Sequence, residues 1–151
     1  MSIRSLCVDR RISISRLGVV LLYLALWVSV TGWRQAGPLL EHSLSFAGWV
    51  LVAIGVMGRI WCGSHIGGKK NSVLVTVGPY SVSRNPLYFC SFLAGLGVAL
   101  VTETLTVPIV FCLLFALYYS KVISAEEETL LAIHGAEFEA YCARVPRFWP
   151  Q

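Results

Sequence analysis

The hydrophobic residues of the chain are gathered into long runs that short polar stretches separate. Four such runs cover about residues 17–33, 44–60, 87–101 and 104–120. The first spans about 26 Å at the rise of an α-helix, which is enough for a thin hydrocarbon core. The first, third and fourth runs also lack the polar face that a surface helix of a soluble protein presents. The pattern therefore predicts an all-α integral membrane protein with four transmembrane helices.

Turn and cap signals fit these boundaries. Thr102, Glu103 and Thr104 mark the junction of the last two runs, as expected for a helical hairpin that turns at the membrane surface. Pro86 and Pro108 stand in or near first helical turns, where a missing N–H costs little. No A-x-A cleavage site follows the first run, so we expect this run to remain as a transmembrane helix.

Composition agrees with a membrane protein. Hydrophobic residues make up 56% of the 151 residues and charged residues 13%, with a mean hydropathy of +0.71. A soluble domain typically carries about 25% charged residues. A soluble four-helix bundle is the competing interpretation, and the missing polar faces disfavour it. The length indicates a single domain over residues 1–151.

The basic residues predict the orientation. Four spans with both termini on one side place every Lys and Arg except Arg34 on that side. The positive-inside rule then puts both termini, the central loop and a helical tail over residues 121–151 in the cytoplasm. The net charge of +4 indicates a basic collar facing membrane lipids. No basic run or stacking motif indicates a nucleic-acid partner.

Neither the cysteines nor the histidines have the spacing of a metal site. The five cysteines form no C-x-x-C pair, so we expect free thiols. The three histidines, His42, His65 and His134, have no metal-like spacing with cysteines or carboxylates. We therefore expect no metal.

Two polar segments carry the candidate chemistry. The first, GPYSVSRNPLYF at residues 78–89, places prolines, tyrosines, an arginine and an asparagine at the entrance of the third run. The second is the tail, where Ser124 with Glu127 matches a capping box and Gly135 is expected to break the helix. On composition alone the tail is an amphipathic segment lying on the membrane.

Taken together, these segments resemble the isoprenylcysteine carboxyl methyltransferase and phospholipid N-methyltransferase family. LVTVGPYSVSRNPLYF at residues 74–89 is similar to the family's core motif. EETLLAIHGAEFEAYCARVPRFWP at residues 127–150, with Glu126 before it, is similar to the motif of the tail. GRIWCGSHIGGKKN at residues 58–71 is similar to the segment before the core motif in bacterial members. The resemblance covers about residues 45–150 and implies a helical membrane enzyme that uses S-adenosylmethionine.

The resemblance also implies which residues form the site. The catalytic residues that it implies are Arg84, Asn85, Glu127 and Arg144. The cofactor-binding residues that it implies are Gly78, Tyr80, Arg84, Asn85, Pro86, Tyr88, Glu126 and Glu127.

These residue types suit the groups of S-adenosylmethionine. Glu126 or Glu127 can take its ammonium group or its ribose hydroxyls, while Arg84 or the free N–H groups at the start of the third run can hold its carboxylate. Tyr80 and Tyr88 can stack on the adenine or face the sulfonium. Since methyl transfer is an in-line displacement, positioning by such contacts supplies much of the catalysis.

Departures from the family pattern leave the methyl acceptor open. Asn85 stands where many members have histidine, and an asparagine cannot titrate. Val122 stands where the eukaryotic carboxyl methyltransferases carry an arginine. The expected acceptor is a lipophilic small molecule or lipid-modified substrate reached from the bilayer, with a carboxyl group favoured over an amine. Two further hypotheses are a sterol-reductase-like enzyme that uses NADPH and a non-catalytic lipid-binding protein.

Overall fold

The described part of the chain is a set of long helices. The computed structural model describes residues 20, 37–67 and 73–150. Its elements are the α-helix α2 (Pro38–Ile66), the 3₁₀ helix η2 (Gly78–Ser81) and the α-helices α3 (Pro86–Val101), α4 (Thr106–His134) and α5 (Ala136–Arg144). No strand occurs within these ranges, which confirms the all-α prediction. The predicted span at residues 17–33 lies, except for Val20, outside the described residues.

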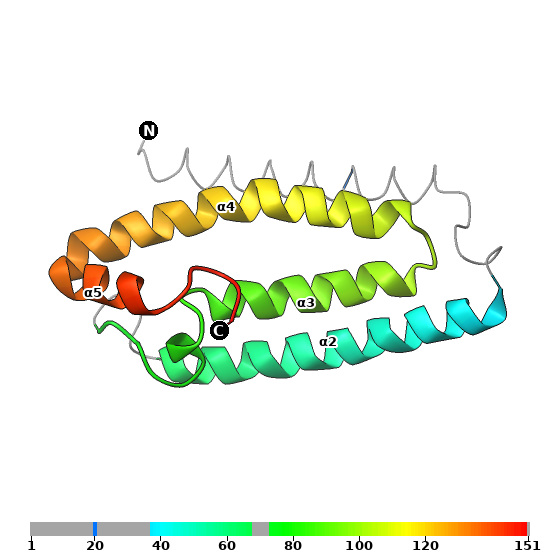
Figure 1. The fold of residues 1–151 in the computed structure, drawn as a ribbon, viewed down its shortest axis with the longest axis horizontal. Helices are drawn as coiled ribbons and strands as arrows, with labels where there is room; N and C mark the ends of the chain where they lie inside the picture. The colour runs from blue at the N-terminus through cyan, green and yellow to red at the C-terminus, as the bar shows by residue number, and fades with distance from the viewer. Residues whose placement is uncertain (1–19, 21–36, 68–72, 151) are drawn as a thin grey trace.

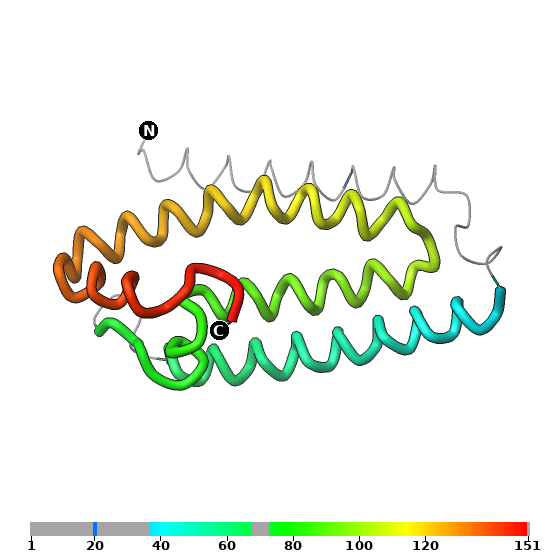
Figure 2. Tube along the Cα trace, viewed as in Figure 1, coloured from blue at the N-terminus to red at the C-terminus, as the bar shows by residue number. Residues whose placement is uncertain are grey.

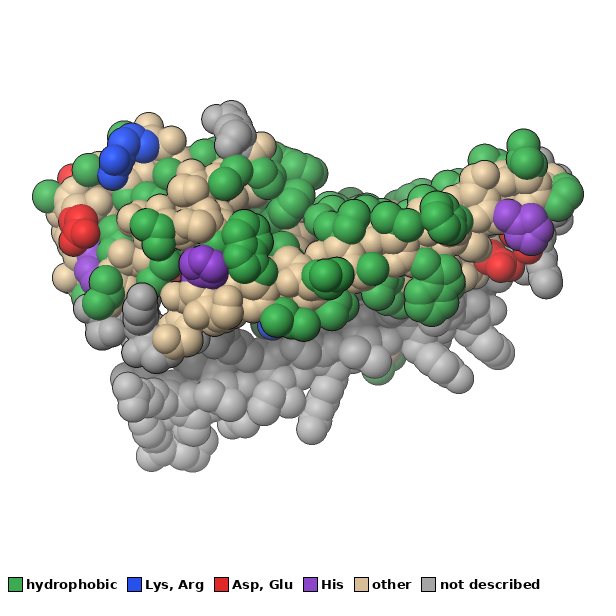
Figure 3. Space-filling view, turned by 90° about the horizontal axis from the view of Figure 1, so that it is seen from below, with side chains coloured by type: hydrophobic (Ala, Val, Ile, Leu, Met, Phe, Trp, Pro, Cys, Tyr) green, Lys and Arg blue, Asp and Glu red, His purple; other side chains and the backbone are tan. Residues whose placement is uncertain are grey.

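Two helices in this part of the chain have the length and composition to cross a membrane. These are α2 and α4, and each has 29 residues, or about 43 Å of helix. Each is longer than the apolar run that predicted it. The helix α3 is apolar as well but has 16 residues. Large apolar side chains such as Phe46, Trp49 and Met57 are exposed along α2 (Figure 3), as expected for a surface that faces lipid.

Small residues bring α2 and α3 into close contact along their length (Figure 1). On α2 the buried residues are Gly48, Gly55 and Cys62, which recur on one face of the helix. A Cβ atom on Gly55 would lie 2.5 Å from the backbone N of Ala94, and one on Gly48 would lie 2.8 Å from the carbonyl oxygen of Gly97. Close backbone approach through small residues is the usual way for helices to associate in membranes.

The chain reverses between α3 and α4, which run antiparallel (Figure 2). Thr102 donates a hydrogen bond from Oγ1 to the carbonyl oxygen of Ala99 at 2.6 Å. Glu103 has a positive φ of 58°, which completes the reversal. Both proline predictions are confirmed, since Pro86 is the first residue of α3 and Pro108 lies in the first turn of α4.

The helix α4 continues past the end of its apolar run, so the predicted capping box is wrong. Ser124 lies inside α4, and its hydroxyl donates to the carbonyl oxygen of Ser120 at 2.9 Å. The helix ends at Gly135, as predicted. Gly135 has a φ of 51° and donates its N–H to the carbonyl oxygen of Leu131 at 2.8 Å.

The short helix α5 folds back toward the loop before α3 (Figure 1). Its buried residues Phe138 and Tyr141 form a core with Val145, against which Leu74 and Leu130 pack. This core joins the end of α4, the helix α5 and the segment before η2. Leu74, Leu130, Phe138 and Tyr141 of this core also line a cavity beside α4.

Candidate active site

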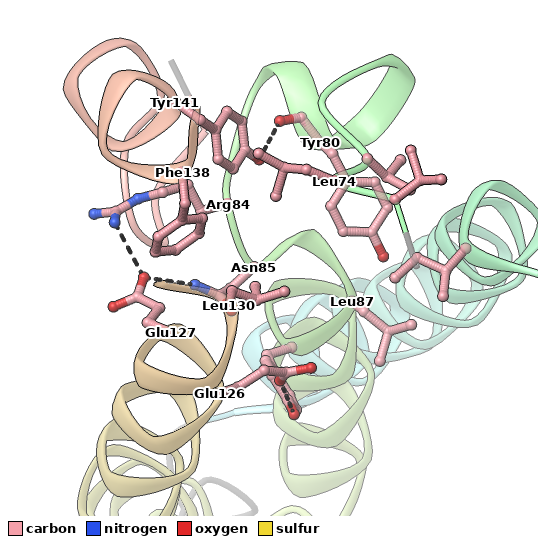
Figure 4. A pocket seen from close by; sticks show the side chains of 14 residues that line it. Leu74, Tyr80, Arg84, Asn85, Leu87, Glu126, Glu127, Leu130, Phe138 and Tyr141 are labelled. Carbon is pink, nitrogen blue, oxygen red and sulfur yellow. Dashed lines mark hydrogen bonds and ion pairs between the residues drawn. The ribbon is translucent and has the colours of Figure 1, made fainter. Parts of the chain in front are cut away.

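A cavity of about 200 Å³ lies where α2 ends and α3 begins, beside the cytoplasmic half of α4 that the charge pattern predicts. Its apolar wall includes Leu74, Leu87, Leu130 and Phe138. Its polar lining consists of Tyr80, Arg84, Asn85, Tyr88, Glu126, Glu127 and Tyr141 (Figure 4). An apolar cavity with a few convergent polar groups is the usual form of a small-molecule site.

Glu127 is held between two arginines. Its Oε1 lies 3.2 Å from Nη1 of Arg84, and its Oε2 lies 3.0 Å from Nε of Arg147. The Glu127 side chain is only 18% exposed, so both ion pairs are partly shielded from solvent. Arg147 also donates from Nη2 to the hydroxyl of Ser124 at 2.7 Å. Glu127 thus joins α4 to the loop before α3 and to the C-terminal segment.

Asn85 is buried at the entrance of α3 and uses its side-chain amide to bridge two segments. Its Nδ2 donates to Oε1 of Glu127 at 3.4 Å and to the carbonyl oxygen of Arg147 at 2.9 Å. Both contacts need an N–H donor, which an amide supplies at every pH. In this arrangement Asn85 acts as a fixed donor, not as a group that exchanges protons.

Glu126 points to the other side of α4 from Glu127 (Figure 4). Its Oε2 accepts a hydrogen bond from the hydroxyl of Tyr88 at 2.7 Å. Within residues 37–67 and 73–150 no cation pairs with Glu126. Its carboxylate therefore keeps acceptor capacity for a ligand, whereas the charge of Glu127 is already neutralised.

Two buried donors at the cavity have no partner among the described residues. They are the hydroxyl of Tyr80 and Nε of Arg84. Tyr80 is only 6% exposed, and burial raises the pKa of its phenol above the ordinary value of 10.0. An unpaired buried donor costs about 1–3 kcal/mol. A ligand with acceptor atoms at these positions would recover that free energy.

The C-terminal segment is bound to the loop before α3 by backbone contacts. Arg84 donates its backbone N–H to the carbonyl oxygen of Pro146 at 2.9 Å. The hydroxyl of Ser83 donates to the carbonyl oxygen of Phe148 at 3.0 Å. Tyr141 donates its hydroxyl to the carbonyl oxygen of Tyr80 at 2.6 Å. Burial raises the pKa of Tyr141 to about 12. These bonds close the cavity on the side of α5.

Most of the residues that the sequence analysis assigned to a site lie together. Tyr80, Tyr88 and the pairs Arg84–Asn85 and Glu126–Glu127 all line the cavity. Gly78 and Pro86 do not line it and instead shape its surroundings. Gly78 has a φ of 63°, and a Cβ atom there would lie 2.6 Å from Nε2 of His65.

Arg144 is not brought to the cavity. It is exposed, and its Nε lies 3.3 Å from the carbonyl oxygen of Ala140 in its own helix. Arg147, and not Arg144, pairs with Glu127. The V-P-R sequence at residues 145–147 was the available signal for Arg147, but its backbone role could not be read from side-chain types.

The family follows from a match over most of the chain. Residues 14–137 match the sequence family described as phospholipid methyltransferase. The chain belongs to this family. Phospholipid methyltransferase family members and isoprenylcysteine carboxyl methyltransferases were the expected relatives, so the resemblance is confirmed.

Individual relatives of this protein are named for different activities. It is 37% identical over 141 residues, 93% of the chain, to the nickel-cobalt-cadmium resistance protein NccN of Alcaligenes xylosoxydans xylosoxydans, of which it covers 65%. It is 31% identical over 78 residues to the protein-S-isoprenylcysteine O-methyltransferase of Schizosaccharomyces pombe. That match covers 52% of the chain and 33% of the yeast protein. The chain thus spans less than two thirds of these curated relatives.

A solved structure has the same fold. The eukaryotic intramembrane Ras methyltransferase, an isoprenylcysteine carboxyl methyltransferase, superimposes with a TM-score of 0.72 at 21% sequence identity. The match covers 88% of this chain and 50% of that protein. This member of the phospholipid methyltransferase family is therefore a membrane protein with this fold, and its described part is all-helical.

Proposed function

We propose that the protein is an S-adenosylmethionine-dependent membrane methyltransferase with a lipophilic acceptor. The observation that carries the proposal is a cavity lined by Glu126 and by Tyr80 and Arg84, which each hold a buried donor without a partner among the described residues. The family supports methyl transfer as the reaction. The site assignments of the sequence analysis become part of this proposal, with Arg144 placed outside the cavity.

The polar atoms of the cavity fit S-adenosylmethionine. Nε of Arg84 is a buried donor that no described residue pairs with, and it suits the carboxylate of the amino-acid moiety. Glu126 suits the ammonium group or the ribose hydroxyls, since it keeps free acceptor capacity. The Tyr80 hydroxyl is a further donor, and Leu74, Leu130 and Phe138 offer apolar surface for the adenine. Bound here, the sulfonium would supply an electrophilic methyl group.

The protein's own part in the reaction is positioning. The network of Glu127 with Arg84 and Arg147 fixes the loop before α3 to α4, so the donors of the cavity are held in place before a ligand binds. The core of α5 and the C-terminal segment exclude water from that side. Asn85 holds this closure through the carbonyl of Arg147 and has no proton to exchange.

The membrane topology is part of the proposal. We place four spans in a bacterial inner membrane, with a single domain over residues 1–151 and both termini in the cytoplasm. The lengths of α2 and α4 and the basic side chains at the cavity end support this. Fusion of a cytoplasmic and of a periplasmic reporter at Gln151 tests it. Activity of the periplasmic reporter would contradict the topology and move the cavity to the other membrane face.

The acceptor is proposed to be a lipophilic molecule or a lipid-modified substrate, with a carboxyl group as the methylated group. The name of the solved structural neighbour supports the carboxyl group. The family description supports a phospholipid, whose amine we take as the second candidate. Access from membrane lipids is supported by the exposed apolar surface of α2.

Titration calorimetry of the full chain in detergent tests the cofactor. We expect saturable binding of S-adenosylmethionine and none of NADPH. Binding of NADPH alone would favour the sterol-reductase-like enzyme, and binding of neither would favour a non-catalytic lipid-binding protein.

A further inference from the structure

Arg59 is a cation on the apolar helix α2 whose role the proposed cavity does not explain. Its Nη1 donates a hydrogen bond to the hydroxyl of Ser91 on α3, and that hydroxyl donates to the carbonyl oxygen of Leu87 at 2.7 Å. Tyr88 of α3 lies against Tyr119 of α4, with ring centroids 5.2 Å apart. Arg59 therefore joins α2 to α3 close to the place where α3 contacts α4.

This cluster lies next to the cavity, on its membrane side. On each of the three helices a cluster residue shares a face with a cavity residue, one or two turns away. The pairs are Arg59 and Ile66 on α2, Ser91 and Leu87 on α3, and Tyr119 and Glu126 on α4. In every pair the cluster residue lies toward the apolar interior of its helix. One turn is about 5.4 Å, so the cluster continues the cavity into the membrane.

The contacts of Arg59 leave its charge uncompensated. Its partner is a neutral hydroxyl, and no carboxylate pairs with it in residues 37–67 or 73–150. Arg59 is exposed on the surface of α2, and a cation on a surface that faces lipid carries a desolvation cost that an anion or a functional ligand usually offsets. The planar guanidinium has donors left for the oxygens of a carboxylate or phosphate.

We propose that Arg59 binds an oxyanion, a carboxylate or a phosphate, that is attached to the apolar chain of the methyl acceptor. This assignment rests on the proposed function, because the cavity beside Arg59 is there taken as the methyl-donor site. The apolar chain lies toward the membrane, and the oxyanion is held beside Ser91, one turn from Leu87 of the cavity. Arg59 is then an acceptor-binding residue contributed by α2, and Val122 on α4 does not need to be an arginine.

The test uses the full chain in phosphatidylcholine nanodiscs and four probes: dodecanoate, dodecyl phosphate, dodecanol and inorganic phosphate. Tryptophan fluorescence reports binding. We expect the two anionic amphiphiles to bind at least tenfold more tightly than dodecanol. This preference should fall to within twofold in Arg59→Gln and be largely kept in Arg59→Lys. Lys121→Gln removes an exposed cation of α4 and should leave the preference unchanged.

Three outcomes would overturn the proposal. They are equal binding of dodecanoate and dodecanol by the wild type, a preference that survives in Arg59→Gln, and displacement of dodecyl phosphate by an equal concentration of inorganic phosphate. The last would indicate a site for a free anion. If Arg59→Gln does not fold, Ser91→Ala should lower the preference about threefold.

Binding of S-adenosylmethionine separates this proposal from the proposed function. Arg59→Gln should bind it with unchanged affinity, within twofold. A wild type that shows the anion preference but binds no S-adenosylmethionine would contradict the proposed function and leave the oxyanion site standing. A tenfold loss of S-adenosylmethionine affinity in Arg59→Gln would place Arg59 in the donor site and overturn its assignment to the acceptor.

Discussion

Nη1 of Arg84 lies 3.2 Å from Oε1 of Glu127, and this ion pair joins the loop before α3 to the middle of the C-terminal half of α4. The same arginine donates from Nη1 to Sγ of Cys142 at 2.8 Å. Its Nε is a buried donor that has no partner among the described residues. One side chain thus has a structural end and an end available to a ligand, while the neighbouring glutamates divide the same two roles between them.

The two glutamates should respond differently to removal of their charge. Glu127→Gln leaves Arg84 and Arg147 without their partner and should lower the free energy of unfolding by about 2 kcal/mol. Glu126→Gln should leave stability nearly unchanged and weaken binding of S-adenosylmethionine at least tenfold, or about 1.4 kcal/mol. Thermal unfolding and calorimetry in detergent measure the two quantities.

Glu128→Gln is the matched control, because Glu128 is exposed on the same helix. It should change neither quantity. Unchanged affinity in the double variant of Glu126 and Glu127 would remove both glutamates from the proposed binding site.

Two tyrosines offer a second matched pair. The Tyr80 hydroxyl is buried without a described partner, so Tyr80→Phe should not destabilise the fold but should weaken S-adenosylmethionine binding. Tyr141→Phe removes the bond to the carbonyl oxygen of Tyr80 and should cost about 1–2 kcal/mol. A stability loss in Tyr80→Phe equal to that in Tyr141→Phe would show that the Tyr80 hydroxyl serves the fold.

The contact between α2 and α3 should tolerate no side chain at Gly55. A Cβ atom there would lie 2.5 Å from the backbone N of Ala94, so Gly55→Ala forces the helices apart and should destabilise the protein by about 2 kcal/mol. Gly63→Ala is the control, because nothing lies within 4 Å of its Cβ position. It should be neutral or stabilise by up to about 1 kcal/mol. Equal thermal stability of the two variants would contradict this packing.

Helix positions could be predicted from the sequence because apolar runs and prolines act locally. The ends of α3, the hairpin and the break at Gly135 all follow from such signals. The capping box at Ser124 failed because the same residues also propagate a helix. Ile123 is buried, and the Ser124 hydroxyl bonds one turn back within the helix, so packing keeps α4 continuous.

The site was predictable only in part. The resemblance brought Arg84, Asn85 and Glu127 forward, and these residues do meet. The link to the C-terminal segment was not predictable, because Asn85 binds the carbonyl oxygen of Arg147 and backbone acceptors leave no trace in side-chain types. The sequence likewise could not show that the hydroxyl of Tyr80 and Nε of Arg84 lack a described partner, because this depends on which groups the fold places beside them.

The pH dependence of methyl transfer should identify the acceptor group. Asn85 cannot take a proton, and among the described residues neither His65 nor His134 lines the cavity. A carboxyl acceptor is already ionised near neutral pH and needs no base, so its rate should be flat between about pH 6 and 8. An amine acceptor must lose a proton, so its rate should rise about tenfold per pH unit below the amine pKa.

Radiolabelled S-adenosylmethionine incubated with membrane extracts measures the rate of methyl transfer at each pH and also the type of product, since an ester releases the label as methanol in base. We expect a flat profile and base-labile label; base-stable label in lipid with a rising profile would establish an amine instead, and label only in a water-soluble product would contradict access from the bilayer.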